Sequence, residues 1–413
     1  MIIKIKEIAI INPRDKLKNN FIASFLPMRA LEAETGMVDL SAKIKSEEGK
    51  RRFTSFRDGD ILFAKITPCM ENGKLALVNG LINGVGFGST EFHVIRLAKA
   101  IDPKYCFYYL IQKKVRKYLR SKMTGTAGQL RVPSKELEDL AIEIYSLSEQ
   151  KRIVAKIESL FSRLDSAKDS LLRVRQEIKR YRQSVLKSAF EGRLTPGISF
   201  SRVTLADVIA KDLGGGTPSK NHMEYWNGNI PWASVKDMNS EGKYLESTID
   251  RITKKAVESS STNLIPAGNI IVCTRISVGK IQINKIAVAI NQDLRAFFLK
   301  ERINIDYFYY YYGTVKFKTS GTTVKGIRKD DLLQYLFPLC SSQEQLQIVK
   351  AIEDYFERAK ILEDAVVQGL DKIEQLKQSI LKKAFEGNLV EPDPADEPVE
   401  VLLERIKKEK AKF

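Results

Sequence analysis

The sequence lacks the features that would place it in a membrane or among metal-binding or disulfide-stabilised proteins. No segment approaches the roughly 18 to 20 uninterrupted apolar residues of a membrane span. Its first 20 residues lack the apolar core of a signal peptide, so we expect a cytoplasmic protein without a membrane partner. Only two histidines are present, and Cys69, Cys106, Cys273 and Cys340 form no C-x-x-C pair. We therefore predict reduced cysteines and no metal site.

Motifs for nucleotide binding and for catalysis are absent as well. The segment G-G-G-T-P-S-K at 214–220 resembles a phosphate loop only superficially, because it contains Pro218 and lacks the second Gly-Lys pair. Asn12-Pro13-Arg14 lacks the second proline and the aromatic residue of an adenine-methyltransferase N-P-P-Y motif. Neither histidine has a Ser, Cys or carboxylate at a spacing that would indicate catalysis. We predict a protein that binds without chemistry, with no catalytic residue and no cofactor of its own.

Charge is the first positive signal. The 413 residues contain 68 Lys and Arg against 51 Asp and Glu, a formal net charge of +17. Hydrophobic residues make up 43%, which is ordinary for a globular chain, and the length suggests two to four domains. The basic excess lies in residues 1–147, 148–196 and 197–342, whereas residues 343–390 and 391–413 are slightly acidic. This distribution favours a polyanionic partner.

The chain contains an internal repeat. Residues 148–194 align without a gap to residues 343–389, and 19 of the 47 positions are identical. Both copies end alike, in S-A-F-E-G-R-L and K-A-F-E-G-N-L, an ending that two unrelated helices of similar apolar spacing would not share. The chain is therefore a tandem duplication.

Each copy of the repeat carries apolar residues at alternating spacings of four and three, the period of a coiled coil. Glu149 to Phe190 spans 42 residues, which corresponds to a helix of roughly 60 Å. We predict two long helices, 148–196 and 343–390 with their caps, that pack on each other; two ordinary amphipathic helices are the alternative. Gly369 interrupts the second seam and indicates either close approach of the partner helix or a kink. The predicted seams are Ile153, Ile157, Leu160, Leu164, Ala167, Leu171, Val174, Ile178, Tyr181 and Val185, and Ile348, Ile352, Tyr355, Ala359, Leu362, Val366, Gly369, Ile373, Leu376 and Ile380.

The segments before the two helices are related more loosely. Residues 90–109 align with residues 292–311, and short apolar runs at 61–66 and 270–276 occur in both. Such runs, broken by Gly, Asn and Pro, are typical of strands in a mixed domain. We predict an α+β protein with two similar mixed α/β domains, 1–147 and 197–342, two long antiparallel helices forming a coiled coil, pseudo-twofold symmetry, and a tail at 391–413.

Basic clusters occupy equivalent places in the two domains. Each follows an aromatic run, Tyr105 to Tyr109 or Tyr307 to Tyr312, that we assign to the core rather than to base stacking. Such a cluster is often only a solvated face, but its repetition favours two surfaces that track phosphates. By charge and turn context, the candidates for nucleic-acid contact are Lys65, Lys74, Lys113, Lys117, Arg120, Lys122 and Arg131, and Lys236, Arg275, Lys280, Lys316, Lys318, Lys325 and Arg328.

Residues that are identical in the two helix copies are candidates for subunit docking or for helix packing. Duplicated surfaces suit two identical partners, although capping and packing alone would also explain them. These residues are Glu149, Gln150, Phe161, Arg163, Ala189 and Phe190, and Glu344, Gln345, Phe356, Arg358, Ala384 and Phe385.

Taken together, these motifs resemble the specificity subunit of a type I restriction-modification system. The resemblance covers nearly the full length and includes the two F-E-G endings, G-G-G-T-P-S-K, Y-W-N-G-N-I-P-W, and the C-terminal E-P-D-P-A-D-E-P-V-E-V-L-L-E-R-I-K. It implies two target-recognition domains, each reading one half of an asymmetric bipartite site in double-stranded DNA. It further implies two methyltransferase (modification) subunits and restriction or motor subunits as partners. S-adenosylmethionine, ATP and Mg would belong to those partners.

Two other interpretations remain open at this level. One is an architectural protein whose coiled coil bridges two nonspecific nucleic-acid-binding domains, although such domains would gain nothing from divergence. The other is a fused methyltransferase-nuclease, against which the missing motifs argue.

Overall fold

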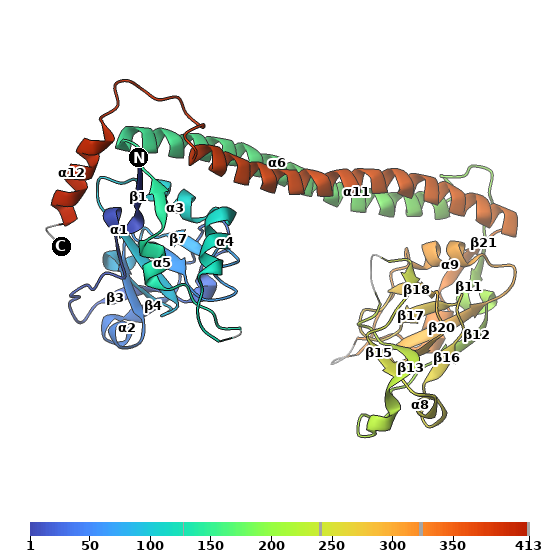
Figure 1. Ribbon diagram of the computed structural model, residues 1–413. Coiled ribbons are helices and arrows are strands. Elements are labelled where there is room, and N and C mark those ends of the chain that lie inside the picture. The colour runs from blue at the N-terminus through green and yellow to red at the C-terminus, as the bar shows by residue number, and fades with distance from the viewer. Residues whose placement is uncertain (127, 239–241, 322–324, 411–413) are drawn as a thin grey trace. The chain divides into compact units, whose positions relative to one another are not determined.

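The structure is a computed structural model that describes residues 1–126, 128–238, 242–321 and 325–410. Two compact units make up the chain. The first unit comprises Met1–Leu171 with Gln368–Phe413, and the second unit comprises Leu172–Val367. Each long helix therefore contributes one part to each unit (Figure 1).

Among its described residues, the first unit contains three sheets. A two-stranded ribbon pairs β1 with β10, one four-stranded sheet has the order β2-β9-β6-β7, and the other has the order β4-β3-β8-β5. In the last sheet β3 and β8 are parallel, while the pairs around them are antiparallel. The strands are β1 (Ile2–Lys4), β2 (Ala9–Ile11), β3 (Ile22–Leu26), β4 (Lys43–Lys45), β5 (Thr54–Arg57), β6 (Ile61–Ala64), β7 (Leu75–Leu77), β8 (Val85–Gly88), β9 (Phe92–Leu97) and β10 (Ala141–Glu143).

The second unit repeats this topology. Its ribbon pairs β11 with β21, and its sheets have the orders β12-β20-β17-β18-β14 and β15-β13-β19-β16. The central pair β13 and β19 is again parallel, and the added edge strand β14 is parallel to β18. The predicted mixed α/β duplication is confirmed. The strands are β11 (Ser201–Thr204), β12 (Ile209–Gly214), β13 (Trp226–Ala233), β14 (Tyr244–Leu245), β15 (Asp250–Ile252), β16 (Asn263–Ile265), β17 (Ile270–Cys273), β18 (Ile281–Asn284), β19 (Val288–Ile290), β20 (Leu294–Leu299) and β21 (Leu336–Leu339).

Short helices cover these sheets. In the first unit, α12 packs on α1 beside the N-terminus (Figure 1), and its Leu402 and Ile406 are buried in the core. Asp102 and Asn304 cap α3 and α9 by accepting hydrogen bonds from backbone N–H groups of the first turn. The helices are α1 (Ile5–Ile8), α2 (Ser46–Arg52), α3 (Pro103–Leu110), α4 (Lys113–Ser121), α5 (Ser134–Glu138), α7 (Leu205–Val208), α8 (Lys254–Glu258), α9 (Ile305–Tyr312), α10 (Lys329–Leu333) and α12 (Val399–Lys410), with 3-10 turns η1 (Met28–Ala30), η2 (Ile82–Gly84) and η3 (Met223–Tyr225).

The two long helices are α6 (Leu147–Phe190) and α11 (Ser342–Ala384). Within the first unit they pair antiparallel, because Lys377 meets Asp165 at 2.6 Å while Leu171 meets Gly369. A Cβ atom at position 369 would lie 2.8 Å from Leu171 Cδ1, so of the two alternatives predicted at Gly369 the structure shows close approach of the partner helix. Within the second unit Arg182 donates to Glu363 at 2.9 Å.

The seam is less apolar than the heptad pattern predicts. Leu362 is 54% exposed and Tyr181 is 42% exposed, and Val174 and Leu376 are also exposed, so their assignment to a buried seam is wrong for this chain by itself. Next to Tyr181 in the second unit, the contact between the helices is made by a cation on an aromatic ring: the Arg182 guanidinium lies 4.9 Å from the centre of the Phe356 ring.

Candidate nucleic-acid interface

The first unit brings a hairpin turn and a loop together at one place. The turn follows β6, and the loop joins α4 to α5. Single bridges connect Ile66 and Thr124 to Arg131, and Thr67 donates its backbone N–H to Leu130 O at 3.0 Å. We call residues 65–68 and 122–131, of which the structure describes all but 127, the first platform. It unites three of the seven basic residues predicted for this domain, namely Lys65, Lys122 and Arg131.

Arg131 is the most firmly held of these cations. Its Nε donates to both carboxylate oxygens of Glu91, at 3.2 and 3.0 Å, and its Nη2 donates to Glu91 Oε1 at 2.9 Å. The Nη1 group donates to Gln129 O at 3.1 Å. This hydrogen-bonded guanidinium holds the pKa of Glu91 below its usual range, so the pair is ionised at neutral pH.

A buried histidine supports the loop that contains Arg131. His93 Nε2 lies 2.8 Å from Val132 O, and His93 Nδ1 lies 3.1 Å from Asn12 Nδ2. A ring that donates from Nε2 and accepts at Nδ1 satisfies both contacts. Burial lowers the pKa of His93 from its usual value, in agreement with a neutral ring.

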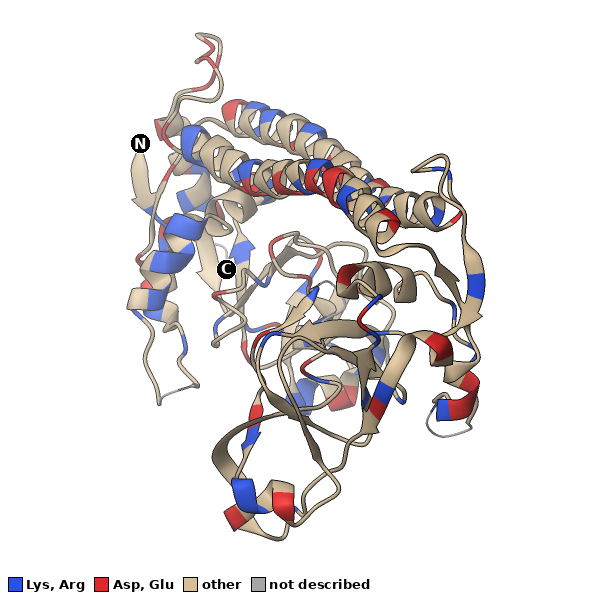
Figure 2. Ribbon diagram, turned by 90° about the vertical axis from the view of Figure 1, so that its right-hand side faces the viewer, with Lys and Arg blue, Asp and Glu red and all other residues tan. Residues whose placement is uncertain are grey.

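The other four candidates of the first unit lie outside the residues of the first platform. Lys74 Nζ donates to Met28 O at 2.8 Å, and Arg120 pairs with Glu71 at 3.3 Å. The backbone N–H of Lys113 donates to Gln378 of α11, and Lys113 lines a hollow with Asp371 and Glu374. Lys117 is exposed on α4, where Figure 2 shows further basic positions. A basic helix therefore does not by itself place its cations on the first platform.

The second unit builds an equivalent junction. Arg275 and Ser320 bridge to Gly326, Ile276 N donates to Lys325 O at 3.1 Å, and Ile327 N donates to Thr274 O at 2.9 Å. We call residues 274–280, 318–321 and 325–328 the second platform. It unites five predicted residues: Arg275, Lys280, Lys318, Lys325 and Arg328.

Within the second platform these side chains differ in how they are held. Arg275 Nη1 lies 3.6 Å from Asp293 Oδ1, and Lys280 Nζ donates to Met238 O at 2.9 Å. Lys318, Lys325 and Arg328 are exposed. Ile276 and Ser277 have φ values of 49° and 57°, a strained region for a β-branched residue that is typical of functional loops. Lys236 and Lys316 are exposed outside this platform.

Sequence reasoning missed two acidic residues that lie beside the platforms, Glu91 and Asp293. Each directly precedes the strand that follows it, β9 or β20, and each faces the arginine of its own platform. The alignment of residues 90–109 with 292–311 already matched these two positions. Selecting residues by positive charge alone excluded them.

The repeated phenylalanines pack each sheet domain against the ends of the two long helices. In the first unit the Phe385 ring lies 4.9 Å from Tyr105 and 5.3 Å from Tyr109, and Phe161 lies 5.8 Å from Tyr108. The aromatic runs therefore belong to the core, as predicted, with Tyr105 and Tyr307 fully buried.

The second unit repeats the same contacts at equivalent positions. Phe190 lies 5.3 Å from Tyr307 and 5.2 Å from Tyr311, and Phe356 lies 5.7 Å from Tyr310. Each sheet domain thus rests on the start of one long helix and the end of the other.

The remaining docking candidates divide into buried and exposed residues. Gln150 and Gln345 are fully buried and accept from the backbone N–H groups of Asp102 and Asn304, and Ala189 and Ala384 are buried too. Arg163 and Arg358 are exposed.

The two glutamates differ between the copies. Burial, followed by the charge of Asp396, raises the pKa of Glu149, whereas hydrogen bonds from Ser341 lower the pKa of Glu344. The helix starts are therefore alike in sequence but not in electrostatics, because Asp396 of the tail reaches only the first of them.

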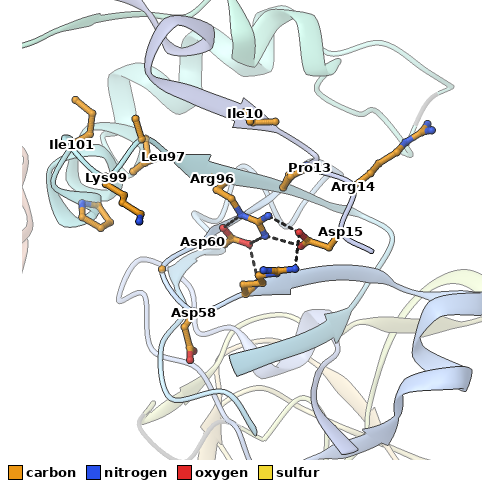
Figure 3. A pocket seen from close by; sticks show the side chains of 14 residues that line it. Ile10, Pro13, Arg14, Asp15, Asp58, Asp60, Arg96, Leu97, Lys99 and Ile101 are labelled. Atoms are coloured by element: carbon orange, nitrogen blue, oxygen red, sulfur yellow. Dashed lines mark hydrogen bonds and ion pairs between the residues drawn. The ribbon is translucent and has the colours of Figure 1, made fainter. Parts of the chain in front are cut away.

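A hollow of about 630 Å³ lies at another part of the first unit (Figure 3). Arg96 crosses it, donating to Asp60 at 2.7 and 2.8 Å and to Asp15 at 2.9 Å, and Arg57 also pairs with Asp15. Each carboxylate faces a guanidinium, so the network is a closed ion cluster that holds the segment after β2 on β9.

Within the described ranges, no group of three or more His, Cys, Asp or Glu side chains is arranged to hold a metal ion. None of the helices in that part of the chain is long and apolar enough to cross a membrane.

The chain is similar in sequence to proteins of one known family. Residues 3–176 and 199–370 both match the family model described as type I restriction modification DNA specificity domain. The EcoAI specificity subunit of Escherichia coli is 39% identical over 168 residues, 40% of this chain and 28% of that protein. The EcoR124I/EcoR124II specificity subunit of Escherichia coli is 34% identical over 245 residues, 56% of this chain and 57% of that protein. These matches span less than two thirds of either relative.

A solved structure shares the fold. A chain from a study of complex assembly and conformational transition of the type I R-M system aligns with a TM-score of 0.71 at 23% identity, covering 94% of this chain and 98% of that one.

Proposed function

The chain belongs to the family of type I restriction modification DNA specificity domains, and from this premise we propose that it is the sequence-reading subunit of a type I restriction-modification complex. In this proposal the first platform reads one half of an asymmetric bipartite site and the second platform reads the other. The chain itself catalyses nothing.

The observation that carries the proposal is the pair of platforms. Both units build a hairpin turn against a loop at equivalent places, and both present cations there. The cations and the loops differ between the units, as they must if each reads a different sequence. An architectural binder of nonspecific character would need the charge but not the difference.

The partners follow from the same premise. Two modification subunits would supply S-adenosylmethionine and methylate adenine, which in a duplex requires base flipping. Restriction subunits would supply ATP-driven and Mg-dependent cleavage of unmodified DNA. The exposed Arg163 and Arg358, at equivalent places on α6 and α11, are suited to contact such a duplicated partner.

Methylation mapping tests this function. The full chain is co-expressed with its modification subunit in a host without DNA methylation, and modified adenines are mapped by long-read sequencing. A split motif with a fixed spacer, lost when this chain is omitted, is expected. A soluble co-purifying complex that modifies no adenine would favour the architectural alternative.

A domain exchange tests the division of labour. Replacing residues 197–342 by the equivalent domain of another family member should change one half of the motif and leave the other half intact. Unchanged recognition would contradict the assignment of one half-site to each unit.

A further inference from the structure

In each unit one arginine of the platform lies beside an acidic residue, Arg131 beside Glu91 and Arg275 beside Asp293, but the two arginines come from different segments. In the first unit the bridge joins Ile66 of the hairpin turn to Arg131 of the loop; in the second it joins Arg275 of the hairpin turn to Gly326 of the loop. The arginine has therefore exchanged sides of the bridge while the acidic residue has kept its place before the strand. Common ancestry does not explain this exchange, whereas a need for a guanidinium at this point does.

Gly326 shows that the exchange involved both sides of the bridge. A Cβ atom at this position would lie 3.2 Å from Arg275 Cγ and 3.3 Å from Thr274 O, so a side chain here would crowd Arg275. The glycine makes room for the arginine opposite.

The contacts of Arg131 leave two of the N–H donors of its guanidinium for a ligand. Glu91 and Gln129 O occupy one N–H each on Nε, Nη1 and Nη2. The second N–H of Nη1 and the second N–H of Nη2 have no acceptor among the described residues, so two donors remain for a ligand. The side chain is 41% exposed, so a ligand can reach the guanidinium.

We propose that Arg131 and Arg275 each read a guanine in the major groove, and that Glu91 and Asp293 are positioning residues that aim the two guanidinium groups. This inference deepens the proposed function and rests on it. Two parallel N–H groups match the O6 and N7 acceptors of guanine, the commonest specific contact of arginine with DNA.

A phosphate contact suits these arginines less well. An ion pair of an arginine and a carboxylate carries no net charge, so it gains little from the polyanionic backbone, and a fixed fork has no advantage in nonspecific attraction. The exposed lysines of the platforms, such as Lys122 and Lys325, are the better phosphate contacts.

The test uses the complex of the full chain with its modification subunit and reads out the methylation motif. Arg131→Lys and Glu91→Gln should both relax the same single position of one half-site, with the preference for guanine falling roughly ten- to hundred-fold, while the other half stays intact. Arg275→Lys and Asp293→Asn should do the same in the other half. Arg52→Gln, which removes an exposed cation paired only across one turn of α2, is the matched control and should leave the motif unchanged.

Variants that lose methylation altogether are examined by binding of the purified complex to matched and singly substituted duplexes. Lost discrimination at one base pair supports the inference. Uniform weakening with a smaller salt dependence would instead reveal a phosphate contact and overturn it. An unchanged motif for Glu91→Gln beside a relaxed one for Arg131→Lys would overturn the positioning role. A wild-type complex that yields no split motif would overturn the proposed function itself, and this inference with it.

Discussion

Lys243 holds the second sheet domain on α11, and its removal gives a sharp test of how that domain is seated. Its Nζ lies 2.9 Å from Asp306 Oδ1 of α9 and 3.0 Å from Glu353 Oε1 of α11, and 4.9 Å from the centre of the Tyr310 ring. The first unit needs no such residue. There Lys104 stands at the position aligned with Asp306 and pairs directly with Glu158, the counterpart of Glu353, at 2.6 Å.

Replacing Lys243 by Met keeps the apolar stem but leaves two carboxylates facing each other. Lys243 is 19% exposed, Asp306 29% and Glu353 49%, so solvent screens the ion pairs only partly. We expect Lys243→Met to lower the free energy of unfolding of the second unit by about 1 to 2 kcal/mol. The matched Lys104→Met should cost at most about 0.5 kcal/mol, because that pair is about half exposed.

The chain offers both a local probe and a rescue. Its two tryptophans, Trp226 and Trp232, lie in the second unit, so urea unfolding followed by tryptophan fluorescence reports that unit. Adding Asp306→Lys to Lys243→Met recreates the direct pair of the first unit and should recover about half of the loss. High salt should shrink the difference between wild type and Lys243→Met. Equal stability of these two proteins, or a double variant weaker than Lys243→Met, would refute the reasoning.

Three further predictions concern the partner surface, a buried histidine and the helix pair. Charge reversal at both Arg163 and Arg358 should weaken co-purification with the modification subunit while leaving the methylation motif unchanged, and an altered motif in an intact complex would contradict the docking role. Burial lowers the pKa of His93, so the neutral ring adds stability above pH 6.5 that is lost as the pH falls through the lowered pKa. Hydrogen exchange near Val132 should therefore become faster relative to the unfolded chain as the pH falls. The variant His93→Gln should flatten this pH dependence. Gly369→Leu should destabilise the helix pair by about 1 to 3 kcal/mol in a circular-dichroism melt, because the larger side chain does not fit beside Leu171. Gly369→Ala should be nearly neutral, because the higher helix propensity of alanine offsets the movement of Leu171. Wild-type stability of Gly369→Leu would argue against close approach.

Periodicity and internal repetition made most of the fold predictable from the sequence. The heptad spacing predicted both long helices, and the matched F-E-G endings indicated the duplication, because these features are local and recur along one element. The sheet order was not predictable from the sequence. Its strands are mostly three to six residues long and pair across distant segments, so their partners depend on packing that no single run encodes.

The basic candidates separated according to tertiary context. Arg131 and Arg275 lie on platforms because bridges between distant loops place them there, whereas Lys74 is tied to Met28 O inside the first unit. Charge alone does not distinguish these cases. The predicted burial of Leu362 in the seam is wrong for a related reason, since a heptad position predicts burial only where a partner covers it.

The two units also differ in what they hold constant. The aromatic seats keep the same residue types at aligned positions, Tyr108 with Phe161 and Tyr310 with Phe356, because packing on a shared helix scaffold tolerates little change. The platforms keep an acid and a guanidinium but exchange the segment that supplies the guanidinium. A surface that had to preserve shape would have kept its residues in place, whereas a surface that had to preserve one contact while changing its neighbours would vary in this way. Duplication therefore supplied two copies of one seat, and divergence of the loops supplied two different surfaces for recognition.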